Sequence, residues 1–277
     1  MSWIRKALIR WSGSSGMQAR LEKYVLFAQF LMGIGSGSDV NSSGERAVFH
    51  ALRACLPAPY CIFDVGANQG QFLRLLLEQF SEESFNVHCF EPGQETFRLL
   101  SASAPAQSNI HLNPVGLSKE PGQATLYYDE QGSGFASLTQ RKLDHFDIHF
   151  SQSETVALDS LDHYCEVNQI EHIDLLKIDI EGHELDALEG ARRLFAAGAI
   201  EMVTFEFGGC NIDTRTYFQD FWYFFQAVGM QIFRITPSGY LSPLHTYDEA
   251  YEQFRTTNFL ACKPNWAAQM IAKAGKE

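Results

Sequence analysis

The hydrophobic and polar residues of the chain follow the order of strands and helices that alternate in an α/β protein. The clearest unit runs from Cys61 to Phe80. Its apolar start, Cys61 to Val65, suits a buried strand, a turn with Gly66 and Gly70 follows, and apolar residues then recur at helical spacing. Strand, glycine turn and helix in this order open a nucleotide-binding βαβ unit.

Further apolar runs predict the rest of one sheet and the helices that cover it. Strands are expected at residues 87–90, 110–115, 175–180, 200–207, 231–235 and 258–262. Helices are expected at residues 45–55, 94–102 and 217–228. Residues 119–158 do not form a simple βα unit, because strand-like runs at 124–128 and 154–158 flank a loop rich in Gly and Ser. They predict an inserted β-hairpin and a loop over the site.

Residues 1–34 predict one or two helices in front of this domain. Trp3, Leu8 and Trp11 share one face with other apolar residues, and Arg5, Lys6 and Arg10 lie on other faces, as in a basic amphipathic helix. A second apolar run, Tyr24 to Ile34, has 11 residues and is too short to cross a bilayer. Residues 1–32 either rest on a membrane or a glycan-assembly partner, or pack on their own domain. Packing on the domain is the favoured interpretation, because amphipathic helices usually face a core.

A loop rich in Gly and Ser, residues 33–44, joins these helices to the domain. Its composition favours a flexible linker, and the alternative is a flap over the cofactor pocket with Glu45 behind it. The expected organisation is an N-terminal helical extension and loop at 1–44, a domain at 45–265 and a tail at 266–277.

Charge and cysteine content narrow the class of protein. The net charge is −12, yet residues 1–23 hold five basic residues against one acidic residue, which leaves 16 basic against 32 acidic in the rest. A body this acidic is a poor partner for a phosphate backbone, so no nucleic acid is expected to bind. The six cysteines include no CxxC pair, so we expect reduced core thiols in a cytoplasmic protein.

The glycine turn limits the choice of cofactor. A dinucleotide fingerprint would have glycine at positions 68 and 71, where this chain has Asn68 and Gln71, and no Gly-Lys-Ser/Thr of a P-loop follows. Gly66 and Gly70 would let a ligand approach the backbone. Glu91, just beyond the strand at 87–90, suits the two ribose hydroxyls of an adenosine cofactor. The turn resembles motif I of class I S-adenosylmethionine (SAM) methyltransferases.

A second cluster of ionisable residues follows the strand at 175–180. Asp179 falls at its carboxyl end, and Glu181, His183 and Glu184 lie on the turn into the next helix. Asp179 or Glu181 could cap the N-terminus of that helix, but capping does not require all four ionisable residues. We therefore expect at least two of them to have a functional role at the sheet edge. Lys177 and Asp179 lie within a buried strand, where such charges are costly unless paired.

Other polar residues are expected at the same sheet edge or in loops. Glu206 ends the strand at 200–207 and should border the same crevice, and Ser118 would lie near a bound adenine. His145 and His149 stand four residues apart and are expected to be a solvated pair, not a metal site.

Together these motifs resemble the FkbM family of SAM-dependent methyltransferases over roughly residues 45–263. The resemblance is carried by five segments: Asp64-Val65-Gly66-Ala67-Asn68-x-Gly70, Glu91-Pro92, Leu158-Asp159-x-Leu161, residues 174–184 and Phe205-Glu206. It implies an α/β fold with a Rossmann-like class I methyltransferase sheet, seven-stranded and mostly parallel. It also implies methyl transfer to hydroxyls of sugars, glycans or natural products. The SAM positions carried over are Asp64, Gly66, Asn68, Gly70 and Glu91, with Ser118, Ser137 and Asp179 lining the same pocket.

Catalysis requires removal of a proton from the acceptor hydroxyl. The candidate catalytic residues are Asp179, His183 and Glu206. In one scheme His183 or Glu206 is the base, and in another Asp179, Glu181 and Glu206 hold a divalent cation. The scheme without metal is favoured. The expected acceptor is a sugar hydroxyl on a glycan, nucleotide sugar or lipid-linked saccharide. The alternatives are N-methylation, O-methylation of a natural product, and a non-catalytic SAM-binding scaffold.

Overall fold

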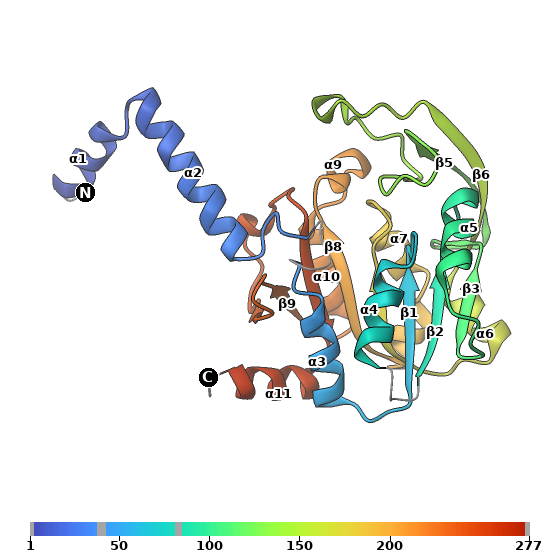
Figure 1. The fold of residues 1–277 in the computed structure, drawn as a ribbon. Coiled ribbons are helices and arrows are strands. Elements are labelled where there is room, and N and C mark those ends of the chain that lie inside the picture. Colours follow the sequence, from blue (N-terminus) through green and yellow to red (C-terminus); the bar gives the residue numbers. More distant parts are fainter. Residues whose placement is uncertain (1–2, 38–42, 81–84, 275–277) are drawn as a thin grey trace.

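The computed structural model describes residues 3–37, 43–80 and 85–274, and side chains to residue 270. Part of the predicted loop, at 38–42, and the end of the predicted tail, at 275–277, lie outside the described residues. Figure 1 shows one sheet with helices on both of its faces, a smaller sheet at one side and two N-terminal helices that point away from the domain.

The main sheet has eight strands. In spatial order they are β10 (Leu241–Pro243), β9 (Gln231–Ile235), β11 (Thr257–Cys262), β8 (Ile200–Phe207), β7 (Ile173–Ile178), β1 (Tyr60–Val65), β2 (Phe85–Phe90) and β3 (Ile110–Asn113). The strands from β8 to β3 pair in parallel, and β11 is antiparallel to both of its neighbours. The predicted mostly parallel sheet is confirmed, but it has eight strands instead of seven. The three-residue strand β10, too short to leave a periodic pattern, adds an eighth strand at the edge.

Helices cover both faces of this sheet because its central strands are apolar on both sides; all six residues of β7 are buried. One apolar core lies under α6 (Leu161–Asn168), α7 (Glu184–Glu189), α8 (Arg192–Ala196) and α10 (Phe218–Ala227). The other lies under α3 (Arg46–Cys55), α4 (Gln71–Gln79), α5 (Gln94–Ser103) and α11 (Pro264–Ala274). Helix α11 packs on the second core through Ala267 and Trp266, so the domain continues into the predicted tail.

The strand order reverses between β1 and β7, which places a crevice at their carboxyl ends. The inserted hairpin is confirmed beside it: β5 (Gly122–Tyr128) pairs antiparallel with β6 (Gln152–Asp159), and β4 (Gly116–Leu117) joins β6 in parallel. The segment between β5 and β6, residues 129–151, lies over the crevice (Figure 1). It contains one 3-10 turn, Asp144–Phe146; another, Glu249–Tyr251, precedes β11.

The N-terminal helices differ from the favoured expectation. Helices α1 (Trp3–Trp11) and α2 (Ser15–Leu31) have no buried residue and extend away from the domain (Figure 1). The expected packing on the domain is wrong, because other helices already cover both faces of the sheet.

The loop after α2 was expected to be a flexible linker. Its described residues instead pack on the domain, because Ile34, Ser36 and Ser43 are buried. A Cβ at Gly33 would come within 2.1 Å of the carbonyl oxygen of Ile235, so this position requires glycine.

The cysteines agree with the prediction of core thiols. Within the described residues they form no disulfide, and Cys89, Cys165, Cys210 and Cys262 are buried.

Candidate active site

A cavity of about 1040 Å³ opens at the carboxyl ends of β1, β2, β7 and β8, beneath the inserted segment 129–151. This volume is at the upper end of the range for small-molecule sites, so it can hold a cofactor and a second molecule. The loop before α3 closes one side through Gly35, Gly37 and Glu45, as the flap interpretation of that loop expects.

The turn after β1 is shaped by contact with the turn after β7. Gly66 has φ of 81°, and a Cβ on it would come within 1.8 Å of the carbonyl oxygen of Asp179. Glycine is therefore required by the close approach of two backbone segments, and not only by a ligand as the sequence suggested. Gly70, with φ of 84°, precedes α4 and does not line the cavity.

Glu91 connects the carboxyl end of β2 to this turn. Its Oε2 accepts a hydrogen bond from the Asn68 backbone N–H at 3.0 Å, and its Oε1 accepts one from Gly93 N–H at 2.9 Å. Burial raises the pKa of Glu91 to about 7. The carboxylate lines the cavity and has lone pairs left for two hydroxyl donors.

The surroundings of Glu91 fit the adenosine part of SAM. The cavity is also lined by the apolar side chains of Phe90, Leu117, Leu126 and Leu158. These side chains can pack against the flat adenine ring. Asn68 Oδ1 is buried and accepts no hydrogen bond from any described residue, so it can accept one from a ligand.

A buried ion pair lies below the cavity. Lys177 Nζ is 3.1 Å from Asp64 Oδ1 and 3.7 Å from Asp179 Oδ2. Burial alone would lower the pKa of Lys177, but the two carboxylates outweigh it and raise this pKa. Asp64 is fully buried and does not line the cavity, and its side chain pairs with Lys177. Lys177 itself lines the cavity, which the sequence did not predict.

The turn after β7 is held by Glu184. Its Oε1 accepts hydrogen bonds from Ile180 N–H and Gly182 N–H, both at 3.0 Å, and the side chain is fully buried. Glu181 has φ of 54°, a strained value for a residue other than glycine. Neither Asp179 nor Glu181 caps α7; both line the cavity together with His183.

Both ring nitrogens of His183 are engaged. Its Nδ1 lies 2.9 Å from Asp186 Oδ2, and its Nε2 lies 3.0 Å from the Thr139 hydroxyl. Because Asp186 fixes the ring, His183 is well placed to hold Thr139 of the inserted segment. It would have to release Thr139 before it could act as a base.

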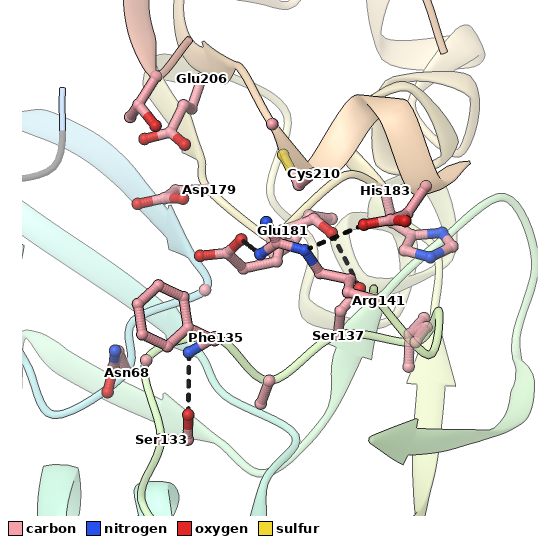
Figure 2. Close-up of a pocket in the computed structure, with 18 of the residues that line it drawn as sticks. Asn68, Ser133, Phe135, Ser137, Arg141, Asp179, Glu181, His183, Glu206 and Cys210 are labelled. Carbon is pink, nitrogen blue, oxygen red and sulfur yellow. Dashed lines mark hydrogen bonds and ion pairs between the residues drawn. The ribbon is translucent and has the colours of Figure 1, made fainter. Parts of the chain in front are cut away.

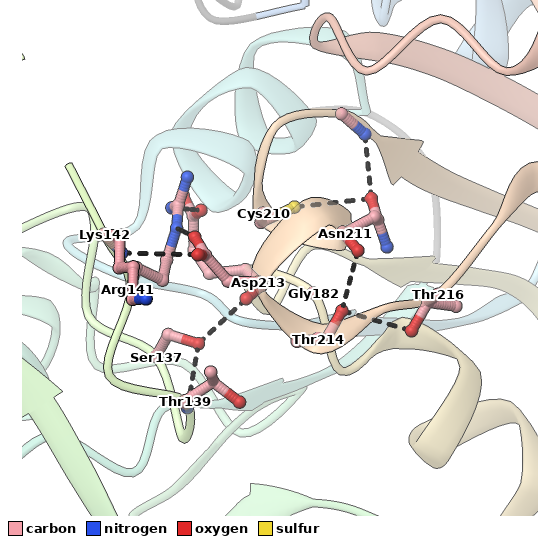
Figure 3. Close-up of polar contacts among 12 residues, drawn as sticks. Ser137, Thr139, Arg141, Lys142, Gly182, Cys210, Asn211, Asp213, Thr214 and Thr216 are labelled. Carbon is pink, nitrogen blue, oxygen red and sulfur yellow. Dashed lines mark hydrogen bonds and ion pairs between the residues drawn. The ribbon is translucent and has the colours of Figure 1, made fainter. Parts of the chain in front are cut away.

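Arg141 fastens the inserted segment over the cavity. Its side chain is buried, forms an ion pair with Glu181 and lies 3.7 Å from Asp213 on α9 (Cys210–Thr214). Ser137 Oγ donates a hydrogen bond to the Glu181 carbonyl at 2.9 Å. Figure 3 shows Arg141 and Lys142 beside Asp213, with Ser137 nearby. The sequence hint for Arg141 is that it forms, with Lys142, two consecutive basic residues in a chain that is acidic overall.

Glu206 and Asp179 lie next to one another at the cavity (Figure 2). Within the described part of the chain, the carboxyl group of Glu206 has no hydrogen-bond partner, while its backbone pairs with β11. Burial and the negative charge of Asp179 raise the pKa of Glu206 well above its ordinary range, which favours the protonated form of this carboxyl group. Burial likewise raises the pKa of Glu45, which also lines the cavity, to about 7.

The structure brings most of the predicted site residues together. Those that line the cavity are Gly66, Asn68, Glu91, Ser137, Asp179, His183 and Glu206. Asp64, Gly70 and Ser118 do not line it. Ser118 lies outside this lining: its backbone N–H donates a hydrogen bond to the Asp159 carbonyl, and its own carbonyl oxygen packs against Gly190.

Both histidines of the predicted solvated pair are exposed. His145 also lines the cavity, and His149 pairs with Asp144. Among the residues with described positions, no group of three or more His, Cys, Asp or Glu side chains is arranged to hold a metal ion.

Comparison with known proteins identifies the family. The sequence profile described as the methyltransferase FkbM domain matches residues 64–232, more than half of the chain. "Methyltransferase 1" of Beauveria bassiana is 27% identical over 155 residues, which cover 50% of this chain and 60% of that protein. The hexuronic acid methyltransferase AglP of Haloferax volcanii is 28% identical over 148 residues, covering 53% of this chain and 56% of that protein. The match thus spans less than two thirds of either relative.

Solved structures include similar folds at low sequence identity. The methyltransferase FkbM of Methylobacillus flagellatus KT is 16% identical with a TM-score of 0.43, and the match covers 86% of this chain and 59% of that one. The plantazolicin methyltransferase BpumL, in complex with SAH, is 9% identical with a TM-score of 0.42, covering 91% and 92%.

Proposed function

The chain belongs to the FkbM methyltransferase family, and from this membership we propose that it transfers a methyl group from SAM to a saccharide hydroxyl. The observation that carries the cofactor assignment is Glu91. Its carboxylate is fixed by the N–H groups of Asn68 and Gly93 at the edge of a cavity large enough for two molecules. A fixed acid at the end of the second strand is the position that binds ribose hydroxyls in nucleotide-binding α/β sheets.

The residues that would hold SAM follow from the walls of the cavity. Glu91 would accept hydrogen bonds from the ribose, and Leu117 and Leu126 would contact the adenine. The cavity is also lined by the carboxyl groups of Glu45 and Asp179, which favour a ligand with positive charge. When bound, SAM supplies a methyl group that its positively charged sulfur releases readily.

The remaining task of the chain is to place the acceptor hydroxyl and remove its proton. The adjacent Asp179 and Glu206 suit this task. The raised pKa of Glu206 favours a protonated carboxyl that can donate a hydrogen bond, while Asp179 accepts the proton. A positioned base contributes roughly 10²- to 10⁴-fold to rate. We assign His183 to positioning, through Thr139 of the inserted segment. In this scheme no metal takes part, so turnover should persist in EDTA.

Two observations support a saccharide acceptor. One relative is named a hexuronic acid methyltransferase. In addition, Phe135 and Phe146 line the cavity with 45% and 67% of their surface exposed, which offers flat apolar rings to the face of a sugar. The saccharide would be part of a glycan, a nucleotide sugar or a lipid-linked precursor.

Mass spectrometry of glycans from cells that carry the parent chain or Glu91→Gln tests this function. We expect a defined sugar to lose one methyl mass in cells with the variant. Unchanged glycans, together with a methylated peptide or natural product that disappears, would assign the acceptor to another class. If no methylated product changes while purified protein still binds SAM, the non-catalytic scaffold is the correct interpretation.

A further inference from the structure

Helices α1 and α2 expose most of the large apolar surface of the described chain. They and the next residue, Met32, contribute thirteen of the twenty large hydrophobic side chains that are exposed. Trp3 and Tyr24, for example, are 78% and 72% exposed. Soluble monomers rarely leave large apolar surfaces uncovered, and such a surface is typical of a region that binds a partner. We propose that α1 and α2 form an arm that binds an anionic lipid surface.

The pattern of α1 fits a helix that lies in the plane of a membrane interface. Trp3, Leu8 and Trp11 lie on one side, and Lys6 and Arg10 lie outside that side. Tryptophan prefers the interface between lipid and water, and α1 carries one at each end. No described helix is both long and apolar enough to cross a bilayer.

Charge selects an anionic lipid surface over a second copy of the arm. The first 23 residues carry five basic side chains and one acidic side chain. Two such arms repel one another, whereas anionic headgroups attract each basic residue. The rest of the chain, with 16 basic and 32 acidic residues, is repelled by the same headgroups. The arm is therefore the part of the molecule that approaches the membrane.

The arm is attached beside the mouth of the cavity. Gln29, the polar residue within the apolar end of α2, donates a hydrogen bond to Gln253 at 2.8 Å and accepts one from Arg255 at 2.9 Å. Arg255 lines the cavity, as do Gly35 and Gly37 just after α2. A lipid surface bound by the arm thus lies near the cavity. This inference does not depend on the identity of the acceptor.

Vesicle flotation tests the proposal. The full chain should float with vesicles of phosphatidylcholine and phosphatidylglycerol in equal parts, bind phosphatidylcholine alone much less, and lose binding as salt rises. Lys6→Gln with Arg10→Gln should weaken binding roughly 30-fold, on the basis of about 1 kcal/mol per basic residue. Leu8→Glu with Trp11→Glu should abolish it. Val167→Glu changes an exposed apolar residue on α6 and should bind like the parent.

Two results would overturn the proposal. One is equal flotation of the parent and the Leu8→Glu, Trp11→Glu variant, with SAM binding showing that both are folded. The other is a parent that ignores anionic vesicles but forms a dimer that this variant splits, because the occupant of the arm would then be a second copy of the chain.

Discussion

Lys177 and Asp64 face one another across the paired strands β7 and β1, with Nζ and Oδ1 3.1 Å apart and both side chains buried. The pair joins the two strands whose carboxyl ends form the centre of the cavity. It also places a positive charge between Asp64 and Asp179, so that the acids of the site can remain close together.

Removal of Lys177 should be strongly destabilising. Lys177→Met leaves the carboxylate of Asp64 buried without its partner, which costs about 3–5 kcal/mol of unfolding free energy. Urea unfolding measures this loss. The double variant Asp64→Asn, Lys177→Met should recover most of it, because no buried charge is then left unpaired. Additive losses in the double variant would show that the two side chains act independently.

Stability of the chain without cofactor should depend on pH through Glu45. Burial raises the pKa of its carboxyl from 4.5 to about 7, so folding takes up a proton between these values. The resulting stabilisation is complete below about pH 4.5 and is lost as pH rises through about 7, and it amounts to at most about 3 kcal/mol.

Unfolding of the parent and Glu45→Gln across this pH range isolates the effect. The difference in unfolding free energy should move in favour of the variant as pH rises. A difference that stays constant with pH would mean that Glu45 titrates normally in the folded chain.

Arg141 should control the inserted segment more than the cofactor. Arg141→Met removes the ion pairs to Glu181 and Asp213, so the segment 129–151 should be cleaved faster by protease and turnover should fall. SAM affinity should change little, since Arg141 does not contact Glu91 or its neighbours. Arg98→Met removes an exposed surface pair and serves as the matched control. Protease sensitivity equal to that of the control would contradict the fastening role.

The proposed proton acceptor is tested by Asp179→Asn and Glu206→Gln. Asp179→Asn should lower kcat roughly 10²- to 10⁴-fold, the usual contribution of a general base. Glu206→Gln should lower it less, because an amide still donates a hydrogen bond. His183→Ala should raise KM more than it lowers kcat if this residue only positions Thr139. Undiminished kcat in both carboxyl variants, with a large loss in His183→Ala, would transfer the role of base to His183.

Local patterns predicted the part of the site that depends on local geometry. The strand, glycine turn and helix from β1 to α4 follow from periodicity, and Glu91 follows from its spacing after the turn. The expected role of Gly66 was incomplete, because its close contact is with Asp179, far away in the sequence. The pairing of Arg141 with Asp213 was not predicted for the same reason.

The N-terminal helices show a different limit of sequence analysis. Amphipathicity predicts that α1 has an apolar face but not what covers that face. Packing on the domain is the common outcome, yet α1 and α2 have no buried residue. Other helices already cover both faces of the sheet. Whether a face is still free for α1 and α2 depends on the whole fold and cannot be read from the local sequence.

Calorimetric titration of the purified chain with SAM, and separately with NAD, is the most direct test of the account. SAM should bind and NAD should not. Glu91→Gln should weaken SAM binding roughly 10- to 100-fold, because hydrogen bonds to a charged group contribute about 1.5–3 kcal/mol. Glu95→Gln, which changes a partly exposed carboxylate paired with Arg98 on the adjacent helix α5, should leave SAM binding unchanged. Binding of NAD without SAM, or SAM binding that is indifferent to Glu91→Gln, would contradict the central claim.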